Sequence, residues 1–145
     1  MRIEHAFTIA APPDAVFAHL ANPANYVGLS PLVVDVREVS RDDGVTCYRA
    51  VERFSVFRKL SYDNVIAVTL VADDDDLTVS GDVVSPGRVR MAYRFGITPE
   101  GDGAAVTDRL LLRAPLGLRR FAASRARQVQ LARARILAER LAAAS

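Results

Sequence analysis

Hydrophobic and polar residues alternate from residue 2 to residue 9, which predicts a strand, because strand side chains point to opposite faces in turn. Residues 11–14 interrupt this strand with two prolines and begin a short amphipathic helix. Proline is tolerated in a first helical turn, and the acidic Asp14 there suits the helix dipole. Asn22 and Pro23 begin a second short helix or turn in the same way.

From residue 32 to about residue 113 the pattern is that of one short strand after another. Turn signals rich in aspartate, glycine and proline separate strands at residues 42–44, 73–76, 85–87 and 101–103. Such spacing is typical of an antiparallel meander. From about residue 118 to residue 143, apolar residues recur at helical spacing without a proline, which predicts one long helix.

These elements together predict an α+β fold with two short helices between the first strand and six later strands. The long C-terminal helix must bury its apolar face, and the only large partner is the sheet. We therefore expect a seven-stranded, curved antiparallel sheet wrapped around that helix. We also expect residues 1–145 to form a single domain, since a domain has about 150 residues.

Two segments of the chain carry a resemblance to a known superfamily. Residues 9–20 read IAAPPDAVFAHL, a strand end followed by an apolar-Ala-Pro step and a helix with an apolar-aromatic pair, and residues 22–31 read NPANYVGLSP. With the element order, this resembles the START-like (SRPBCC) superfamily of helix-grip proteins, and most closely the bacterial polyketide cyclase/dehydrase and lipid-transport-like group. The resemblance implies a deep apolar cavity between sheet and helix that takes polyketides, lipids, sterols or quinones.

Composition narrows the classes of function. The formal net charge of +2 is too small to indicate a nucleic-acid partner, and no apolar stretch approaches the ~20 residues of a membrane span. One cysteine and two histidines exclude a cysteine cage and a histidine-rich zinc site, so we expect no metal and no cofactor, with only a mixed carboxylate site left open. Glu4 and His5 stand where a signal peptide would be apolar, so we expect a cytoplasmic protein without stable membrane insertion.

Alternation assigns part of each strand to the inner face of the sheet, and helical spacing adds residues of the long helix. The expected lining of the ligand cavity is His5, Phe7, Val34, Tyr48, Phe54, Tyr62, Asn64, Ile66, Val79, Met91, Tyr93, Phe95, Leu110, Phe121, Arg125 and Val129. A bulge in any strand would reverse the assignments that follow it.

Two carboxylates, Glu52 and Asp108, share the inner face with apolar residues. Intramolecular aldol cyclisation of a poly-β-ketone needs a base, a donor that polarises a carbonyl group, and a shaped cavity. Either carboxylate could be the base, and the donor could be Tyr48, Tyr62, Tyr93 or Arg125. We favour the alternative interpretation, that these carboxylates lie near a solvated rim and have no catalytic role.

Three hypotheses of function follow. The first, which we favour, is binding of a small hydrophobic molecule without catalysis. The second is a polyketide cyclase, aromatase or dehydratase. The third is an interaction module that presents the C-terminal helix, whose residues 115–145 carry seven arginines and one acid. We expect those arginines to form the solvent face of the helix and to attract the acidic turns. The oligomeric state stays open, with a homodimer among the options.

Overall fold

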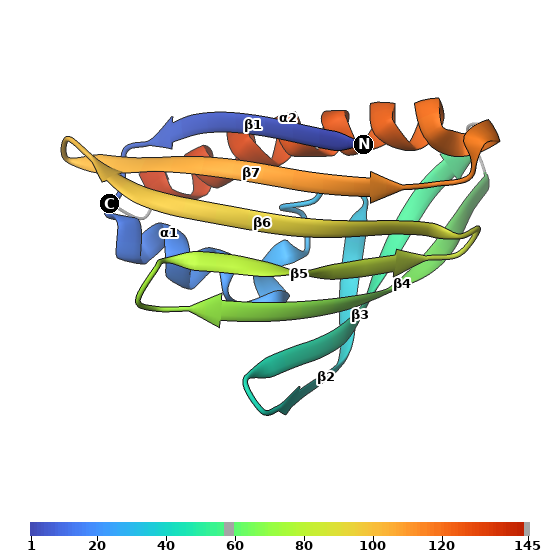
Figure 1. Ribbon diagram of the computed structural model, residues 1–145, viewed down its shortest axis with the longest axis horizontal. Coiled ribbons are helices and arrows are strands. Elements are labelled where there is room, and N and C mark those ends of the chain that lie inside the picture. Colours follow the sequence, from blue (N-terminus) through green and yellow to red (C-terminus); the bar gives the residue numbers. More distant parts are fainter. Residues whose placement is uncertain (57–59, 144–145) are drawn as a thin grey trace.

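Seven strands form one antiparallel sheet in the order β1-β7-β6-β5-β4-β3-β2, so that the first strand pairs with the last (Figure 1). This computed structural model describes residues 1–56 and 60–143. The strands are β1 (Arg2–Ile9), β2 (Val33–Asp42), β3 (Val45–Val56), β4 (Leu60–Asp73), β5 (Thr78–Ser85), β6 (Val89–Glu100) and β7 (Gly103–Arg113). The predicted seven-stranded antiparallel sheet is confirmed.

Two short helical elements lie between β1 and β2, as the proline positions predict. The α-helix α1 (Pro13–Leu20) buries Val16 and Leu20 completely. The 3-10 helix η1 (Pro23–Tyr26) is capped by Asn22, whose side-chain oxygen accepts a hydrogen bond from the Ala24 N–H at 3.1 Å. Each element therefore starts at a proline and buries one side in the core.

The long C-terminal helix α2 (Arg119–Ala143) follows the 3-10 turn η2 (Leu116–Leu118). It begins one residue later than predicted, because the Leu118 N–H bonds to the Pro115 carbonyl in a tighter turn. α2 packs against β1 and β7, whereas β2, β3 and β4 curve away from it (Figure 1). The sheet thus grips the helix along one edge and leaves its remaining concave face free for other contacts.

The C-terminal half of α2 is fastened to the connection between α1 and β2. The guanidinium of Arg140 donates to the carbonyl oxygens of Asn25 at 2.7 Å and Val27 at 2.8 Å, and lies 3.2 Å from the His19 ring. Partial burial and the Arg140 charge lower the pKa of His19. The expectation that the helix arginines all face solvent is wrong for Arg140, because backbone carbonyls attract its side chain inward.

Gly81, in the middle of β5, allows an unusually close approach of β4. A methyl group at this position would overlap the Thr69 carbonyl oxygen and lie 2.8 Å from the Tyr93 hydroxyl oxygen. That hydroxyl donates to the Thr69 carbonyl at 2.7 Å, and the Thr69 side chain accepts from the Asp82 N–H at 2.9 Å. The tyrosine is thereby tied to the backbone of a strand two places away in the sheet.

We expect Gly81→Ala to lower the free energy of unfolding by about 1–3 kcal/mol, since backbone must move to admit the methyl group. The matched control is Gly96→Ala in β6, where an added methyl group would meet no atom within 4 Å. Urea denaturation of the two variants and the wild type measures the difference. Equal stability of both variants would contradict the close approach.

Candidate functional site

A cavity of about 710 Å³ lies between the concave face of the sheet and α2. This volume falls within the ~300–1,000 Å³ typical of small-molecule sites. Most of the wall is apolar, with contributions from β3, β4, β6 and α2. The cavity reaches the surface near the β5–β6 turn and the start of α2, where Tyr62 is 54% exposed and Phe121 is exposed as well. We call this end the mouth, and the opposite end, at Tyr26 and Arg133, the deep end.

Most residues that alternation assigned to the inner face do lie in the cavity wall. They are Tyr48, Phe54, Tyr62, Asn64, Ile66, Met91, Tyr93, Phe95, Leu110, Phe121, Arg125 and Val129. Glu52, one of the two candidate carboxylates, lines the cavity too.

Four predicted lining residues lie outside the cavity wall. His5 and Phe7 stack on each other with ring centroids 5.6 Å apart, on the strand that α2 covers directly, so no space is left there. Val34 is exposed, because an irregularity between Val33 and Asp35 shifts the register and turns Val33 inward instead. Val79 faces inward but is completely buried in the packed core.

The polar side chains of Glu52, Asn64 and Ser85 line the cavity between its middle and its mouth. Glu52 and Asn64 stand opposite each other on β3 and β4, and the Asn64 amide lies 3.5 Å from the Glu52 carboxylate and 3.3 Å from the Ser85 hydroxyl. Burial raises the pKa of the Glu52 carboxyl, and the Asn64 hydrogen bond and the Arg125 charge offset part of this rise. Glu52 is therefore a partly desolvated carboxyl group facing the cavity, which is the environment of a stronger base.

Arg125 extends from α2 between two aromatic rings at the mouth. Its guanidinium carbon lies 5.0 Å from the Phe54 ring centroid and 5.4 Å from that of Phe121. Phe54 in turn stacks on Tyr62 with centroids 5.2 Å apart. These cation–π contacts hold a positive charge beside the opening without a carboxylate partner in the described part of the chain.

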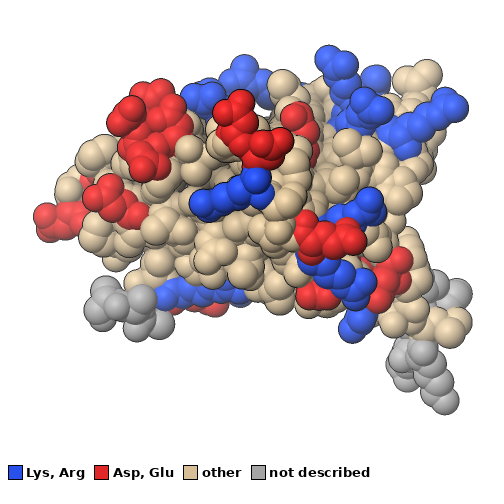
Figure 2. Space-filling model, turned by 90° about the horizontal axis from the view of Figure 1, so that it is seen from below, with Lys and Arg blue, Asp and Glu red and all other residues tan. Residues whose placement is uncertain are grey.

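Charge is distributed unevenly between the two ends of the molecule. Exposed arginines lie near the mouth, in the β5–β6 turn and the start of β6 (Arg88 and Arg90) and at the start of α2 (Arg119 and Arg120). Acidic side chains gather at the end that carries the β4–β5 turn, residues 73–76, and basic ones gather at the opposite end (Figure 2). The surface around the mouth is therefore rich in positive charge.

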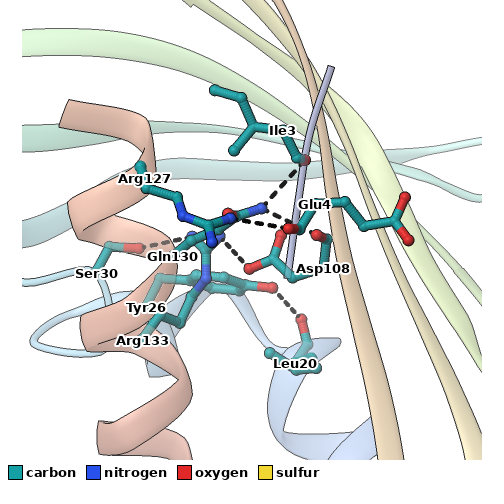
Figure 3. A network of polar contacts seen from close by, with 9 residues as sticks. All are labelled: Ile3, Glu4, Leu20, Tyr26, Ser30, Asp108, Arg127, Gln130 and Arg133. Carbon is teal, nitrogen blue, oxygen red and sulfur yellow. Dashed lines mark hydrogen bonds and ion pairs between the residues drawn. The ribbon is translucent and has the colours of Figure 1, made fainter. Parts of the chain in front are cut away.

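At the deep end, a buried ion pair joins α2 to β7. Arg133 donates to the Asp108 carboxylate at 2.7 Å and to the Ser30 hydroxyl at 3.3 Å (Figure 3). Its guanidinium carbon also lies 5.0 Å from the centroid of the Phe95 ring. Asp108 is only 1% exposed and does not line the cavity, so its placement at a solvated rim is wrong. The arginine pairs with Oδ2 of the buried carboxylate, whereas Oδ1 has no hydrogen-bond partner in the described part of the chain. Beside it, Gln130 donates to the backbone carbonyls of Asp108 and Ile3.

Three tyrosines surround the same end of the cavity. The Tyr26 hydroxyl donates to the Leu20 carbonyl at 2.7 Å, and the Tyr93 hydroxyl is held by Thr69. Tyr48, from β3, is the third. Burial raises the pKa of each of the three, so all of them keep their protons at neutral pH.

The sequence model of the family described as polyketide cyclase/dehydrase and lipid transport matches residues 1–144. The chain belongs to this family. A comparison with curated proteins finds no match. In the described part of this family member, no helix is long and apolar enough to cross a membrane, and no group of three or more His, Cys, Asp or Glu residues could hold a metal ion.

Solved structures similar to this family member share its fold. The START superfamily protein from Mycobacterium smegmatis superposes with a TM-score of 0.80 at 13% identity, over 99% of both chains. The Zhui aromatase/cyclase from Streptomyces sp. R1128 gives 0.78 at 16% identity, over 97% of this chain and 93% of that one. The protein TTHA0849 from Thermus thermophilus gives 0.73 at 22% identity, over 100% and 99%. At these identities, the likeness concerns the fold alone.

Among the polar residues at the deep end, sequence reasoning predicted Tyr48 and Tyr93 but missed Tyr26, Ser30 and Arg133. Arg133 was expected on the solvent face, yet it follows Arg125 by eight residues and Val129 by four, which places it on the same side of the helix. That spacing was a usable signal. Tyr26 and Ser30 belong to the segment after α1, which has no periodicity that could assign an inner face.

We expect Asp108→Leu to cost about 3–5 kcal/mol of unfolding free energy, because it leaves the Arg133 charge buried without its partner. The double variant Asp108→Leu/Arg133→Met should recover most of this loss, since a pair of apolar side chains often replaces a buried ion pair at little cost. Denaturant unfolding of the single and double variants measures both effects. A double variant less stable than Asp108→Leu would contradict this account of the pair.

Proposed function

We propose that this protein binds a small hydrophobic molecule of the polyketide, lipid, sterol or quinone class in the cavity between the sheet and α2. The observation that carries the proposal is the cavity itself, about 710 Å³ with a mostly apolar wall and a mouth at the surface. Burying apolar surface contributes about 2.5 kcal/mol per 100 Å². The burial of a ligand's apolar surface in this cavity therefore provides a favourable free energy of binding.

Membership of the family and the distribution of polar groups support the same proposal. The family's description names polyketide chemistry and lipid transport, and one structural neighbour is an aromatase/cyclase. The polar side chains of the wall include Arg133 with Tyr48 at the deep end, Glu52 with Asn64 nearer the mouth, and Arg125 at the mouth itself. Such an arrangement suits a largely apolar molecule that carries oxygen atoms at separate positions.

Filling the cavity with protein should abolish binding. Ala126 is buried on α2 and faces the cavity, so Ala126→Phe places a ring in the ligand's space. We expect this variant to lose at least tenfold in affinity for the neutral fluorescent probe phenylnaphthylamine, measured by fluorescence titration. Gln128→Phe, at an exposed position of the same helix, is the matched control and should bind as the wild type does.

Undiminished binding by a folded Ala126→Phe variant would place the probe elsewhere and contradict the proposal. Circular dichroism and a cooperative thermal transition establish that the variant is folded.

A second candidate function, cyclisation of a poly-β-ketone, is favoured by the position of Glu52. Its carboxylate, with a pKa raised by burial, would remove a proton from a carbon between two carbonyl groups. The resulting enolate carbon would form a bond to a second carbonyl carbon, whose oxygen takes up a proton. Arg125, beside the same part of the cavity, would stabilise the charge on that oxygen.

Glu52→Gln tests whether this carboxyl is desolvated. Because its pKa is raised in the folded state, wild-type Glu52 favours folding below its ordinary pKa of 4.5 and loses that contribution as pH rises through the raised value. We therefore expect Glu52→Gln to be as stable as the wild type or more stable at pH 7. This advantage should vanish near pH 4, as thermal unfolding across the pH series will measure.

Glu100→Gln, which makes the same substitution at an exposed position outside the cavity wall, is the matched control. A loss of stability in Glu52→Gln at neutral pH would show that the ionised carboxylate is well stabilised, and would count against Glu52 as the base. The same variant should abolish turnover of an aryl triketone if the second function holds.

A further inference from the structure

The hydroxyl of Tyr48 is a hydrogen-bond donor without a partner at the deep end of the cavity. The residue is only 6% exposed and lines the cavity, and no hydrogen bond of its side chain occurs within residues 1–56 and 60–143. Because the residue lines the cavity, its hydroxyl group can donate a hydrogen bond to a ligand atom there. A ligand atom at this position can therefore form the hydrogen bond that no protein group among the described residues forms with the Tyr48 hydroxyl.

The two neighbouring tyrosines do not share this property. The Tyr26 hydroxyl donates a hydrogen bond to the Leu20 carbonyl oxygen, and the Tyr93 hydroxyl donates one to that of Thr69, each at 2.7 Å. Their hydroxyl groups are thus fixed in orientation. Of the three phenolic protons around this end, the one on Tyr48 remains available to a ligand.

Arg133 adds further donors beside Tyr48. It is 9% exposed, lines the cavity and uses one N–H on Asp108 and one on Ser30. A guanidinium carries five N–H groups, and the Nε atom of Arg133 is buried without a partner. Its positive charge also opposes the rise in the pKa of Tyr48, which places the two groups within electrostatic reach. Figure 3 shows Arg133 beside Ser30 and Tyr26, turned toward Asp108.

Donors predominate in the unused hydrogen-bonding capacity at this end, because the Tyr48 hydroxyl can donate or accept and Arg133 can only donate. Two unpaired acceptor atoms lie nearby, Asp108 Oδ1 and Gln130 Oε1, but neither residue lines the cavity. A ligand group that contacts Arg133 must therefore accept a hydrogen bond. A ligand hydroxyl could give its own proton only to Tyr48, whereas a carbonyl oxygen can accept from Tyr48 and Arg133 together.

The charge balance distinguishes between acceptors. The Arg133 guanidinium already has the Asp108 carboxylate at 2.7 Å, so the pair is neutral as a unit. A carboxylate group of a ligand would lose its hydration here without finding an unpaired cation in return. A neutral carbonyl oxygen loses much less hydration free energy when it leaves water.

We propose that the deep end of the cavity is a subsite for a neutral carbonyl oxygen of a ketone or quinone, which accepts its principal hydrogen bond from the Tyr48 hydroxyl with the Arg133 guanidinium beside it. This subsite rests on the proposed function, since it lies in the same cavity. It orients the ligand with one carbonyl group innermost and leaves the remainder of the molecule directed toward Glu52 and the mouth.

A pair of rigid probes of equal shape tests the subsite. Fluorenone carries one ketone, and fluorene carries a methylene group in its place. We expect Tyr48→Phe to weaken fluorenone binding about 3–10-fold, the equivalent of one hydrogen bond, and to leave fluorene binding unchanged. Isothermal titration or competition with phenylnaphthylamine measures both affinities. The variant removes a hydroxyl that has no protein partner, so its thermal stability should equal that of the wild type.

Thr98→Val, which removes a hydroxyl group at an exposed position of β6 outside the cavity wall, is the control and should leave both affinities unchanged. Infrared spectroscopy adds an independent readout. The carbonyl stretch of bound fluorenone should lie at lower frequency in the wild type than in Tyr48→Phe, since a donated hydrogen bond weakens the C=O bond.

Each outcome decides between the proposals. If Tyr48→Phe changes the two probes equally, or leaves the carbonyl stretch unchanged, the subsite is wrong while binding in the cavity stands. If fluorene carboxylate binds the wild type more tightly than fluorenone does, the deep end recognises anions and the assignment to a neutral carbonyl is overturned. If no probe binds, or Ala126→Phe binds all of them normally, the proposed function itself fails and the subsite fails with it.

Discussion

The depth and register of α2 in the sheet depend on the buried ion pair between Arg133 and Asp108. Both groups are almost fully removed from water, and a charge in that setting must find its partner or destabilise the fold by several kcal/mol. Sliding the helix by one turn, ~5.4 Å, would separate them. Gln130 reinforces the same register through the backbone carbonyls of β1 and β7. Hydrophobic contacts alone would tolerate several registers, whereas this polar contact selects one.

The cavity is a consequence of the position in which these contacts hold α2. A straight helix held over β1 and β7 cannot also touch the strands that curve away, and the space that remains under β3 and β4 is bounded by their inward side chains. The ion pair also divides the chemistry of the cavity, because it neutralises the cation at the deep end while Arg125 at the mouth keeps its charge. One end is therefore suited to neutral polar atoms and the other to electron-rich ones.

Alternation along the strands was sufficient to predict the sheet and most of the cavity wall, because each strand has one buried face and its period of two is exact. It could not predict where the sequence adds an irregularity, so Val33 rather than Val34 points inward. His5 and Phe7 were assigned to the right face, but the pattern does not say which strands the helix covers. The partner of Asp108 lies 25 residues away on another element, and such pairings are set by tertiary structure. The volume of the cavity depends on sheet curvature, which residue type does not encode.

The polar contacts that fasten α2 begin in its middle, which separates two tasks within a single helix. They come from Arg127, Gln130, Arg133 and Arg140, which bond to β1, β7 and the segment after α1. The earlier turns, with Phe121 and Arg125, line the cavity. If the proposed function holds, substitutions in these earlier turns would alter which molecule is accepted without loosening the attachment. Selection would then change the ligand of such a protein over evolutionary time while the scaffold stays constant.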